Sequence, residues 1–384
     1  MYIVSYNPTY VGIPFTEFST IDENTDLENL NLNWREQDLP ERVRTKHVHR
    51  LHPYLGKFIP QLVEIFLRKY RPNSVLDPFC GCGTTLVQAN ELGIKSIGCD
   101  ISIFNCMISK VKTDKYDLSI LQSEILELIN KLKFEYPYHS ENDFSDYLKT
   151  WYSQKSLDDL FHFKETLESF TYNNLYKVIL SRAARSARLT THYDLDFPKK
   201  PIRVPYYCRK HSRICYPVKE ANKFLIRYCN NTFKRIVEFA EYRTDADVVI
   251  INGDSSNVVF PKVDIVITSP PYVGLIDYHE QHRYAYDLLN LPSNDHHEIG
   301  SATNGSGQKA QKEYKKAMMK VYDNLKTAVK RSGIIITIIN DKYNLFNPDK
   351  FGFVEEMRLK RHVNRRTGMR KSNFFEEILI WRNK

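Results

Sequence analysis

Two acids and two glycines between residues 77 and 100 have the types and the spacing of a nucleotide-binding site. Asp77, Gly81 and Gly83 lie in residues 73–102, NSVLDPFCGCGTTLVQANELGIKSIGCDIS, just after a short apolar run. Glycines at that place let the backbone approach a ligand closely, and a helix that follows them points its N-terminus at the same ligand. Asp100 ends a second apolar run, near the spacing at which an acid accepts hydrogen bonds from ribose hydroxyls in doubly wound folds.

This glycine turn differs from a dinucleotide site. The third glycine of the dinucleotide pattern is missing, because Leu86 stands at its position. The turn also begins with Asp77, whose carboxylate repels a pyrophosphate but suits a cationic amino group such as that of S-adenosylmethionine. We therefore expect a nucleotide-like cofactor of that kind, with a purely structural turn as the alternative. Cys80 and Cys82 lack a second Cys/His pair at zinc spacing, so no metal site is predicted.

A second unusual segment is DIVITSPPYVGLIDY, residues 264–278, in which an apolar run changes abruptly to Thr-Ser-Pro-Pro-Tyr. Proline has no backbone N–H to give to a sheet ladder, so a strand cannot continue through Pro270 and Pro271. The pattern predicts a buried strand that stops there and presents Ser-Pro-Pro-Tyr as a rigid turn.

DPFCGCGTT at residues 77–85 and TSPPY at residues 268–272 together resemble the amino-group DNA methyltransferases, which methylate cytosine N4 or adenine N6 with S-adenosylmethionine. HPYLGKFIP, residues 52–60, resembles the segment that closes over the methionine part of the cofactor in that family. NGD, residues 252–254, resembles the strand end where an acid meets the adenine ring. The resemblance covers roughly residues 45–110 and 245–384. It implies an α/β fold of the Rossmann-like class I methyltransferase type.

The resemblance also implies a role for the Ser-Pro-Pro-Tyr turn. An amino group conjugated to a pyrimidine is a poor nucleophile, so its lone pair must be freed as the methyl sulfonium approaches. The Ser269 side chain and the Pro270 carbonyl would accept the amino hydrogens, and Tyr272 would stack on the flipped base. The implied catalytic residues are Ser269, Pro270, Pro271 and Tyr272. The implied cofactor-binding residues are Tyr54, Lys57, Phe58, Asp77, Phe79, Gly81, Gly83, Thr84, Thr85, Asp100, Asp254 and Ser269.

Serine before the two prolines resembles the cytosine-N4 branch more than the adenine branch. The leading expectation is therefore a site-specific DNA methyltransferase that makes N4-methylcytosine in a prokaryotic restriction–modification system. Double-stranded DNA is the expected partner, and a cognate restriction endonuclease is considered as a second one. The alternatives are an adenine-N6 enzyme, an RNA methyltransferase and a catalytically silent nucleic-acid-binding module. The Pro-Cys dipeptide that carbon-5 cytosine enzymes need is absent.

The elements that position these residues follow from the hydrophobic pattern. DVVIINGD, DIVITSPPY, GIIITIIN and FFEEILIWRNK predict further strands, and a helix is expected from Pro60 onward. Short apolar strands separated by helices predict a mostly parallel, doubly wound sheet. From about Tyr116 to Tyr242 the pattern is mostly helical, with a proline-broken middle expected to be extended or looped. We expect an N-terminal arm (residues 1–44), a catalytic domain (45–114 and 243–384) and an inserted helical region (115–242).

The composition agrees with a nucleic-acid enzyme inside the cell. The formal charge of +9 favours a polyanionic partner. No stretch approaches the roughly 20 apolar residues of a membrane span, and the N-terminus lacks the signal-peptide pattern. Seven irregularly spaced cysteines favour reduced thiols, so we expect a cytoplasmic protein.

The positive charge is concentrated between residues 182 and 235, which hold 14 Lys/Arg against 3 Asp/Glu. Arg182, Arg185 and Arg188 recur every three residues, so one helix face is expected to meet phosphates. The family's common layouts place the recognition region elsewhere, so its assignment to residues 115–242 rests on this charge. The predicted nucleic-acid contacts are Arg182, Arg185, Arg188, Lys199, Lys200, Arg209, Lys210, Arg213, Tyr278, His282, Arg365 and Arg366.

Overall fold

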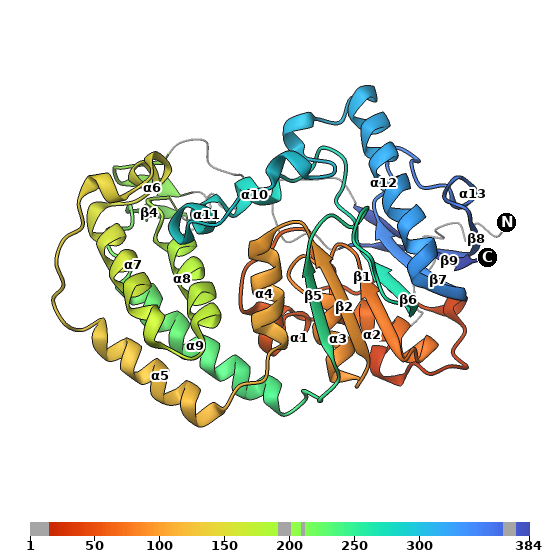
Figure 1. Ribbon diagram of the computed structural model, residues 1–384, viewed down its shortest axis with the longest axis horizontal. Helices are drawn as coiled ribbons and strands as arrows, with labels where there is room; N and C mark the ends of the chain where they lie inside the picture. The colour runs from red at the N-terminus through yellow and green to blue at the C-terminus, as the bar shows by residue number, and fades with distance from the viewer. Residues whose placement is uncertain (1–14, 191–200, 209–211, 364–373) are drawn as a thin grey trace.

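A computed structural model describes residues 15–190, 201–208, 212–363 and 374–384. Its centre is a seven-stranded sheet with the order β5-β2-β1-β6-β7-β9-β8 (Figure 1). The strands are β1 (Ser74–Asp77), β2 (Lys95–Asp100), β5 (Val248–Asn252), β6 (Val263–Thr268), β7 (Val329–Ile339), β8 (Phe353–His362) and β9 (Phe375–Asn383). The strands β5, β2, β1, β6 and β7 are parallel, while β9 runs antiparallel to both β7 and β8.

The central strands β1 and β6 and the second half of β7 are buried on both faces, which explains why they read as continuous apolar runs. Successive side chains point to opposite faces, so Val75 and Leu76 of β1 enter two different hydrophobic clusters. Helices α2 (Pro60–Tyr70) and α3 (Thr84–Glu91) supply the cluster on one face. Helix α12 (Gln308–Ala328) and the short α13 (Pro348–Phe351) supply the cluster on the other.

This topology confirms the predicted class I methyltransferase fold. Counted along the chain within the sheet, the strand order is 3-2-1-4-5-7-6, which is the doubly wound pattern with an antiparallel pair at one edge. The parallel strands β1, β2, β5 and β6 end at Asp77, Asp100, Asn252 and Thr268. Because these strands are parallel, all four ends lie at one edge of the sheet, where doubly wound folds bind their ligands.

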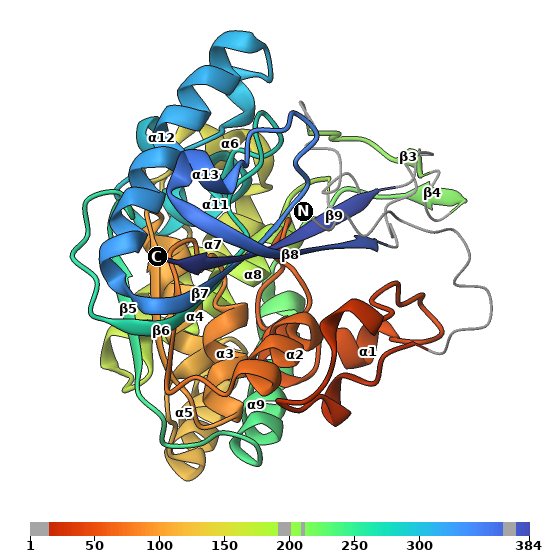
Figure 2. The same cartoon turned by 90° about the vertical axis from the view of Figure 1, so that its right-hand side faces the viewer.

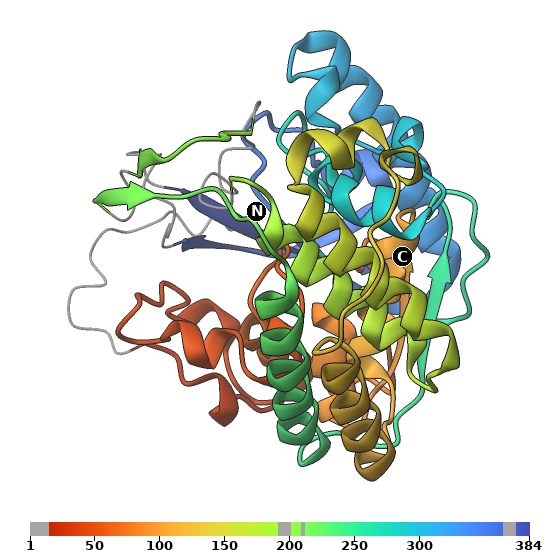
Figure 3. The ribbon, with the colours of Figure 1, turned by 90° about the vertical axis from the view of Figure 1, so that its left-hand side faces the viewer.

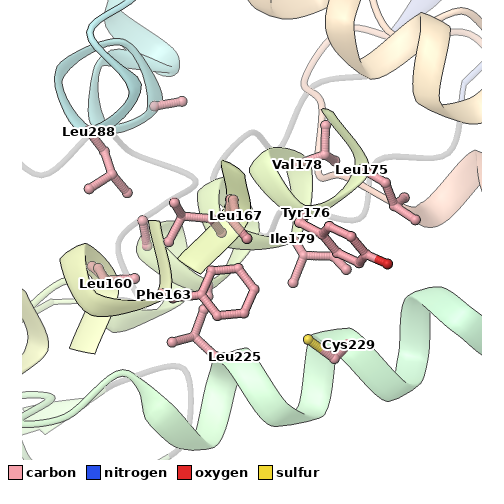
Figure 4. Close-up of a cluster of buried hydrophobic side chains, with 14 of the residues drawn as sticks. Leu160, Phe163, Leu167, Leu175, Tyr176, Val178, Ile179, Leu225, Cys229 and Leu288 are labelled. Atoms are coloured by element: carbon pink, nitrogen blue, oxygen red, sulfur yellow. The ribbon is translucent and has the colours of Figure 1, made fainter. Parts of the chain in front are cut away.

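The chain between β2 and β5 is mainly helical and forms a separate lobe (Figures 1 and 3). Its helices are α5 (Leu118–Lys131), α6 (Asp146–Trp151), α7 (Gln154–Thr166), α8 (Asn173–Ala187) and α9 (Asn222–Ala240), while α4 (Ile103–Thr113) packs against β2 and β5 of the sheet. Phe163, Tyr176, Ile179 and Leu225 pack together inside this lobe (Figure 4). The same cluster continues into Tyr284 and Leu288 of α11 (Arg283–Leu289), which joins the lobe to the sheet domain.

Some elements differ from the sequence-based expectation. The proline-broken segment contains a short hairpin of β3 (Tyr206–Cys208) and β4 (Arg213–Cys215). Strand β8 was not predicted, because glutamates and basic residues interrupt its apolar positions at the sheet edge. The acidic segment after residue 14 was expected to be loops. It has only short 3₁₀ turns, yet Leu27 and Trp34 are buried beside α2. In the part of the chain that the structure covers, no helix has the length and apolarity needed to cross a membrane.

Candidate active site

The carboxyl edge of the sheet holds a cavity of about 810 Å³, counting the part that is open to solvent. The predicted cofactor residues on its wall are Tyr54, Lys57, Phe58, Phe79, Gly81, Thr84, Asp100, Asp254 and Ser269. These residues come from five separated segments of the chain, so the fold assembles most of the set that the motifs indicated.

The glycine turn, residues 77–85, leaves no room for side chains at its glycines. Gly81 has a φ of 49°, and a Cβ there would lie 2.8 Å from the Tyr54 hydroxyl oxygen. Gly83 has a φ of 77° at the N-cap of α3, and a Cβ there would lie 2.8 Å from Ser109 Oγ. Both angles belong to the left-handed region that glycine adopts at little cost. The tight turn therefore brings the ring of Tyr54 directly against the backbone that faces the cavity.

Asp77 does not line the cavity, although the sequence placed it against a cationic ligand group. It is 1% exposed, and its oxygens accept hydrogen bonds from Thr85 Oγ1 (2.7 Å), Thr268 Oγ1 (2.7 Å) and the Phe79 N–H (3.1 Å). Burial raises the pKa of Asp77 to about 6, against the lowering effect of these hydrogen bonds. In this structure Asp77 links the glycine turn to the end of β6 through its hydrogen bonds with Thr85 and Thr268.

Asp100 and Asp254 are the predicted acids that reach the cavity wall, which Glu298 also lines. Asp100 accepts hydrogen bonds from the Gly81 N–H (2.9 Å), the Ser102 N–H (2.9 Å) and Asn105 Nδ2 (3.0 Å). Burial raises the pKa of Asp100 above its usual value. Asp254 accepts from the Ser256 N–H at 2.8 Å. Each carboxylate has about four acceptor positions, so both retain capacity for a ligand hydroxyl or amine.

The proline turn, residues 269–272, follows β6 as predicted and is braced by residues that the sequence did not single out. The Tyr314 hydroxyl donates to the Pro271 carbonyl at 2.8 Å. The Tyr272 hydroxyl donates to Glu376 Oε1 at 3.4 Å. Arg361 donates to the other oxygen of Glu376 from Nε (2.9 Å) and Nη2 (2.6 Å). These braces come from distant segments and follow no local pattern, so only the fold reveals them.

A second cavity lies on the other side of the proline turn. It has about 1530 Å³ of empty space, including its open part, and Tyr272 is on its wall. Its other lining residues include Asn340, Lys342, Tyr343, Phe375 and Glu377. Aromatic rings can stack on a planar base, while amide, ammonium and carboxylate groups can meet its polar edge. Because Ser269 and Pro271 face the first cavity, the proline turn separates the two spaces.

Two of the predicted nucleic-acid contacts, Arg188 and His282, are buried in this structure. Arg188 is 9% exposed, its Nε donates to the Arg185 carbonyl, and its guanidinium lies over the ring of Tyr284. His282 is 1% exposed and packs among the rings of His52 and Phe104. Burial lowers the pKa of His282 to about 3, so the imidazole is neutral at physiological pH. Neither side chain is placed to meet a phosphate.

The other predicted contacts lie in different environments. Arg182 is half-buried, donates to Asn231 Oδ1 at 2.8 Å and covers the ring of Tyr228. Tyr278 lies in the wall of the first cavity, with its ring stacked 5.6 Å from that of Tyr54. The remaining described contacts are Arg185, which is half-buried, and Arg213, which is exposed on β4. The predictions for Lys199, Lys200, Arg209, Lys210, Arg365 and Arg366 lie outside the described residues.

Comparisons with known proteins agree with this geometry. The family model described as DNA methylase, of the N6/N4 methyltransferase type, matches residues 17–111. The chain is 37% identical to the Type II methyltransferase M.MjaII of Methanocaldococcus jannaschii, over 88% of this chain and 81% of that protein. It is 26% identical to the Type II methyltransferase M.MvaI of Kocuria varians, over 74% of this chain and 64% of that protein. Among solved structures, the rRNA methyltransferase AviRa of Streptomyces viridochromogenes has a TM-score of 0.35 at 11% identity, over 87% of this chain and 89% of that one. At that TM-score the fold assignment rests on the strand order alone.

Proposed function

Because the chain belongs to the family of N6/N4 DNA methylases, we propose that it is a Type II DNA methyltransferase specific for cytosine N4. In this proposal a methyl group moves from S-adenosylmethionine to a cytosine that has been flipped out of double-stranded DNA. The observation that carries the proposal is the position of the proline turn, with the cavity lined by the glycine turn on one side and the aromatic-lined cavity on the other.

The first cavity fits S-adenosylmethionine. Gly81 lets Tyr54 and the turn backbone close around a ligand, because a Cβ at this glycine would fill that space. Asp100 would bind the ribose hydroxyls, and Phe79 and Asp254 would hold the adenine ring. When bound, this cofactor supplies an electrophilic methyl group on a sulfonium. Since Asp77 is occupied behind the turn, Tyr54 and Lys57 are the residues that we assign to the methionine end.

The proline turn would hold the target amino group. The Ser269 hydroxyl and the Pro270 carbonyl would accept its two N–H hydrogens, which directs the nitrogen lone pair toward the first cavity. Tyr314 fixes the adjacent Pro271 carbonyl. Glu376 and Arg361 fix the hydroxyl of Tyr272, whose ring would stack on the base from the side of the second cavity. Methyl transfer forms the new N–C bond as the C–S bond breaks, and the nitrogen then releases one proton.

Serine at position 269 is the feature that favours cytosine N4 over adenine N6. The same geometry would also hold an adenine amino group, so an adenine-N6 enzyme is the second candidate. The relatives named above are Type II methyltransferases, which supports DNA as the substrate and a restriction–modification system as the setting. A cognate restriction endonuclease would be the partner in such a system.

We also propose that the inserted region, residues 115–242, takes part in DNA recognition. The β3–β4 hairpin projects from the molecule on the same side as the end of β8 and the start of β9 (Figures 2 and 3). It carries exposed apolar and aromatic side chains beside Arg213: Tyr207, Ile214 and Tyr216. Exposed rings next to a cation suit a partner with stacked bases and phosphates. The catalytic domain would then consist of residues 45–114 and 243–384.

Removal of the Ser269 hydroxyl tests the role that we assign to the proline turn. Ser269→Ala is expected to lower kcat for methyl transfer to DNA about 100-fold, because one acceptor for the amino hydrogens is lost. Cofactor affinity, measured by calorimetry, is expected to change less than about threefold, because the walls of the first cavity remain. Ser293→Ala, in an exposed loop, is the matched control. Unchanged turnover in Ser269→Ala would overturn the assignment.

A further inference from the structure

His47, His49 and Glu91 form a buried group that the proposed reaction does not use. The histidines lie in the short 3₁₀ turn His47–Arg50, and Glu91 is the last residue of α3. His47 Nε2 is 2.9 Å from Glu91 Oε1, and His49 Nε2 is 3.9 Å from the same oxygen. One ligand atom from each residue lies within 4.8 Å of the other two. Three groups that commonly bind metals therefore converge on one point inside the protein.

Two buried ring nitrogens of this group lack hydrogen-bond partners. His47 Nδ1 and His49 Nε2 are buried and unpaired, whereas His47 Nε2 and Glu91 Oε1 face each other at 2.9 Å. Burying a polar atom unpaired costs about 1–3 kcal/mol, so two such atoms are not expected without compensation. His47 also has a φ of 30°, in the left-handed region that a histidine adopts only at a cost. A ligand between the three side chains would compensate for both.

Neighbouring cations orient the three side chains but do not occupy the space between them. Lys46 Nζ binds Glu91 Oε2, which leaves Oε1 facing the histidines. Arg235 donates to the His47 carbonyl at 3.0 Å, and Lys57 donates to the His49 carbonyl at 2.8 Å. These cations oppose an added positive charge. Each of them already has a carboxylate or carbonyl partner, and the imidazoles can bind as neutral ligands.

We propose that His47, His49 and Glu91 form a zinc site, with a fourth position open to water. Zinc bonds of about 2.0–2.2 Å in a tetrahedral arrangement separate neighbouring ligand atoms by about 3.3 Å. The observed separations of 2.9 and 3.9 Å lie on either side of that value. Two imidazoles and one carboxylate are a ligand set that zinc accepts. The site goes beyond the methyl-transfer function and does not depend on it.

The zinc would join two segments that shape the first cavity. The histidines precede the segment that carries Tyr54 and Lys57, and Glu91 ends the helix that begins after the glycine turn. A metal at this place would hold the turn before Tyr54 against the end of α3, since both histidines are buried and the Glu91 side chain is 8% exposed. The alternative is a protonated His47 that pairs with Glu91 alone. That pair would bind no zinc, so metal content separates the two arrangements.

The test measures zinc in the untagged full chain after incubation with ZnSO₄ and desalting. We expect about one zinc per chain by mass spectrometry, and visible absorption of a tetrahedral site when Co²⁺ replaces it. His49→Gln and Glu91→Gln should each lower the zinc content at least fivefold. His296→Gln should leave it unchanged, since His296 lies 3.6 Å from Asp295 in an exposed pair.

Thermal unfolding gives a second readout. Removal of the metal with a chelator should lower the Tm of the wild-type chain by several degrees, because zinc binds only the folded state. Cobalt absorption and zinc content of the wild type decide the question even if a variant fails to fold. A wild-type chain that holds less than about 0.1 zinc, or zinc that His49→Gln does not displace, would overturn the proposal.

Discussion

At the scale of single residues, the structure changes the role of an acid that the motif singles out. Asp77 is the most deeply buried acid at the carboxyl edge, and it connects the glycine turn to Thr268 through hydroxyl hydrogen bonds. A local pattern shows that an acid stands at the end of β1, but not which way its side chain points. Asp100 and Asp254, which do reach the cavity, stand at equivalent strand ends.

The raised pKa of Asp77 predicts how stability depends on pH. Its pKa of about 6 in the folded chain exceeds the ordinary value of 3.8, so between these values the folded state holds more protons than the unfolded state. Stability from this group therefore falls as pH rises through that window and is constant above it. Relative to Asp77→Asn, the wild type should lose about 1 kcal/mol of unfolding free energy between pH 5 and pH 8. Urea unfolding of both chains at several pH values checks this, and parallel pH profiles would contradict it.

At the scale of elements, we predict that substitution of a glycine in the glycine turn weakens cofactor binding, with a glycine outside the turn as the control. Gly81→Ala combines a positive φ with a Cβ that meets Tyr54 at 2.8 Å. Gly93→Ala meets nothing within 4 Å at a φ of 71°. Both changes should cost about 1 kcal/mol of stability. Only Gly81→Ala should also weaken S-adenosylmethionine binding, by about tenfold, because it displaces the cavity wall. Calorimetry on both variants measures this, and equal affinities would show that Tyr54 does not shape the cofactor site.

The elements that the sequence predicted are those with a strong local pattern. Short, contiguous segments of the sequence encode both the strand–turn–helix around Asp77 and the proline turn after β6. The spacing correctly places Arg182 and Arg185 on α8, whereas Arg188 is the residue just after the end of that helix. It cannot show that Tyr228 of α9 and Tyr284 of α11 lie against Arg182 and Arg188. Tyr314, Glu376 and Arg361 could not have been predicted, because they meet the proline turn only through the tertiary fold.

At the scale of the whole molecule, the basic residues that are exposed on the surface, and not their concentration along the sequence, indicate where DNA would bind. Part of the arginine-rich segment is used inside the protein, where Arg182 and Arg188 pack over tyrosine rings. Arg213 remains exposed on the hairpin that projects beside the start of β9 (Figure 2). The hairpin and the second cavity therefore mark the side on which we expect DNA to bind.

Charge reversal tests that orientation. Arg213→Glu should weaken binding to a DNA duplex about tenfold at low salt and reduce the slope of log K against log salt by about one. Lys95→Glu is the control, because Lys95 is exposed at the start of β2, at the opposite edge of the sheet. Fluorescence anisotropy over a range of KCl concentrations measures both. Equal losses in the two variants would place the DNA elsewhere.

The central claim is that the proline turn holds a cytosine amino group for methylation. The most direct test is to express the chain in a host that lacks DNA methylation, digest the host DNA to nucleosides and analyse them by mass spectrometry. We predict N4-methylcytosine, at a much lower level when Ser269→Ala is expressed instead. N6-methyladenine would keep the reaction but contradict the selection of the base by Ser269. DNA without either base, from cells that contain folded protein able to bind S-adenosylmethionine, would contradict the account.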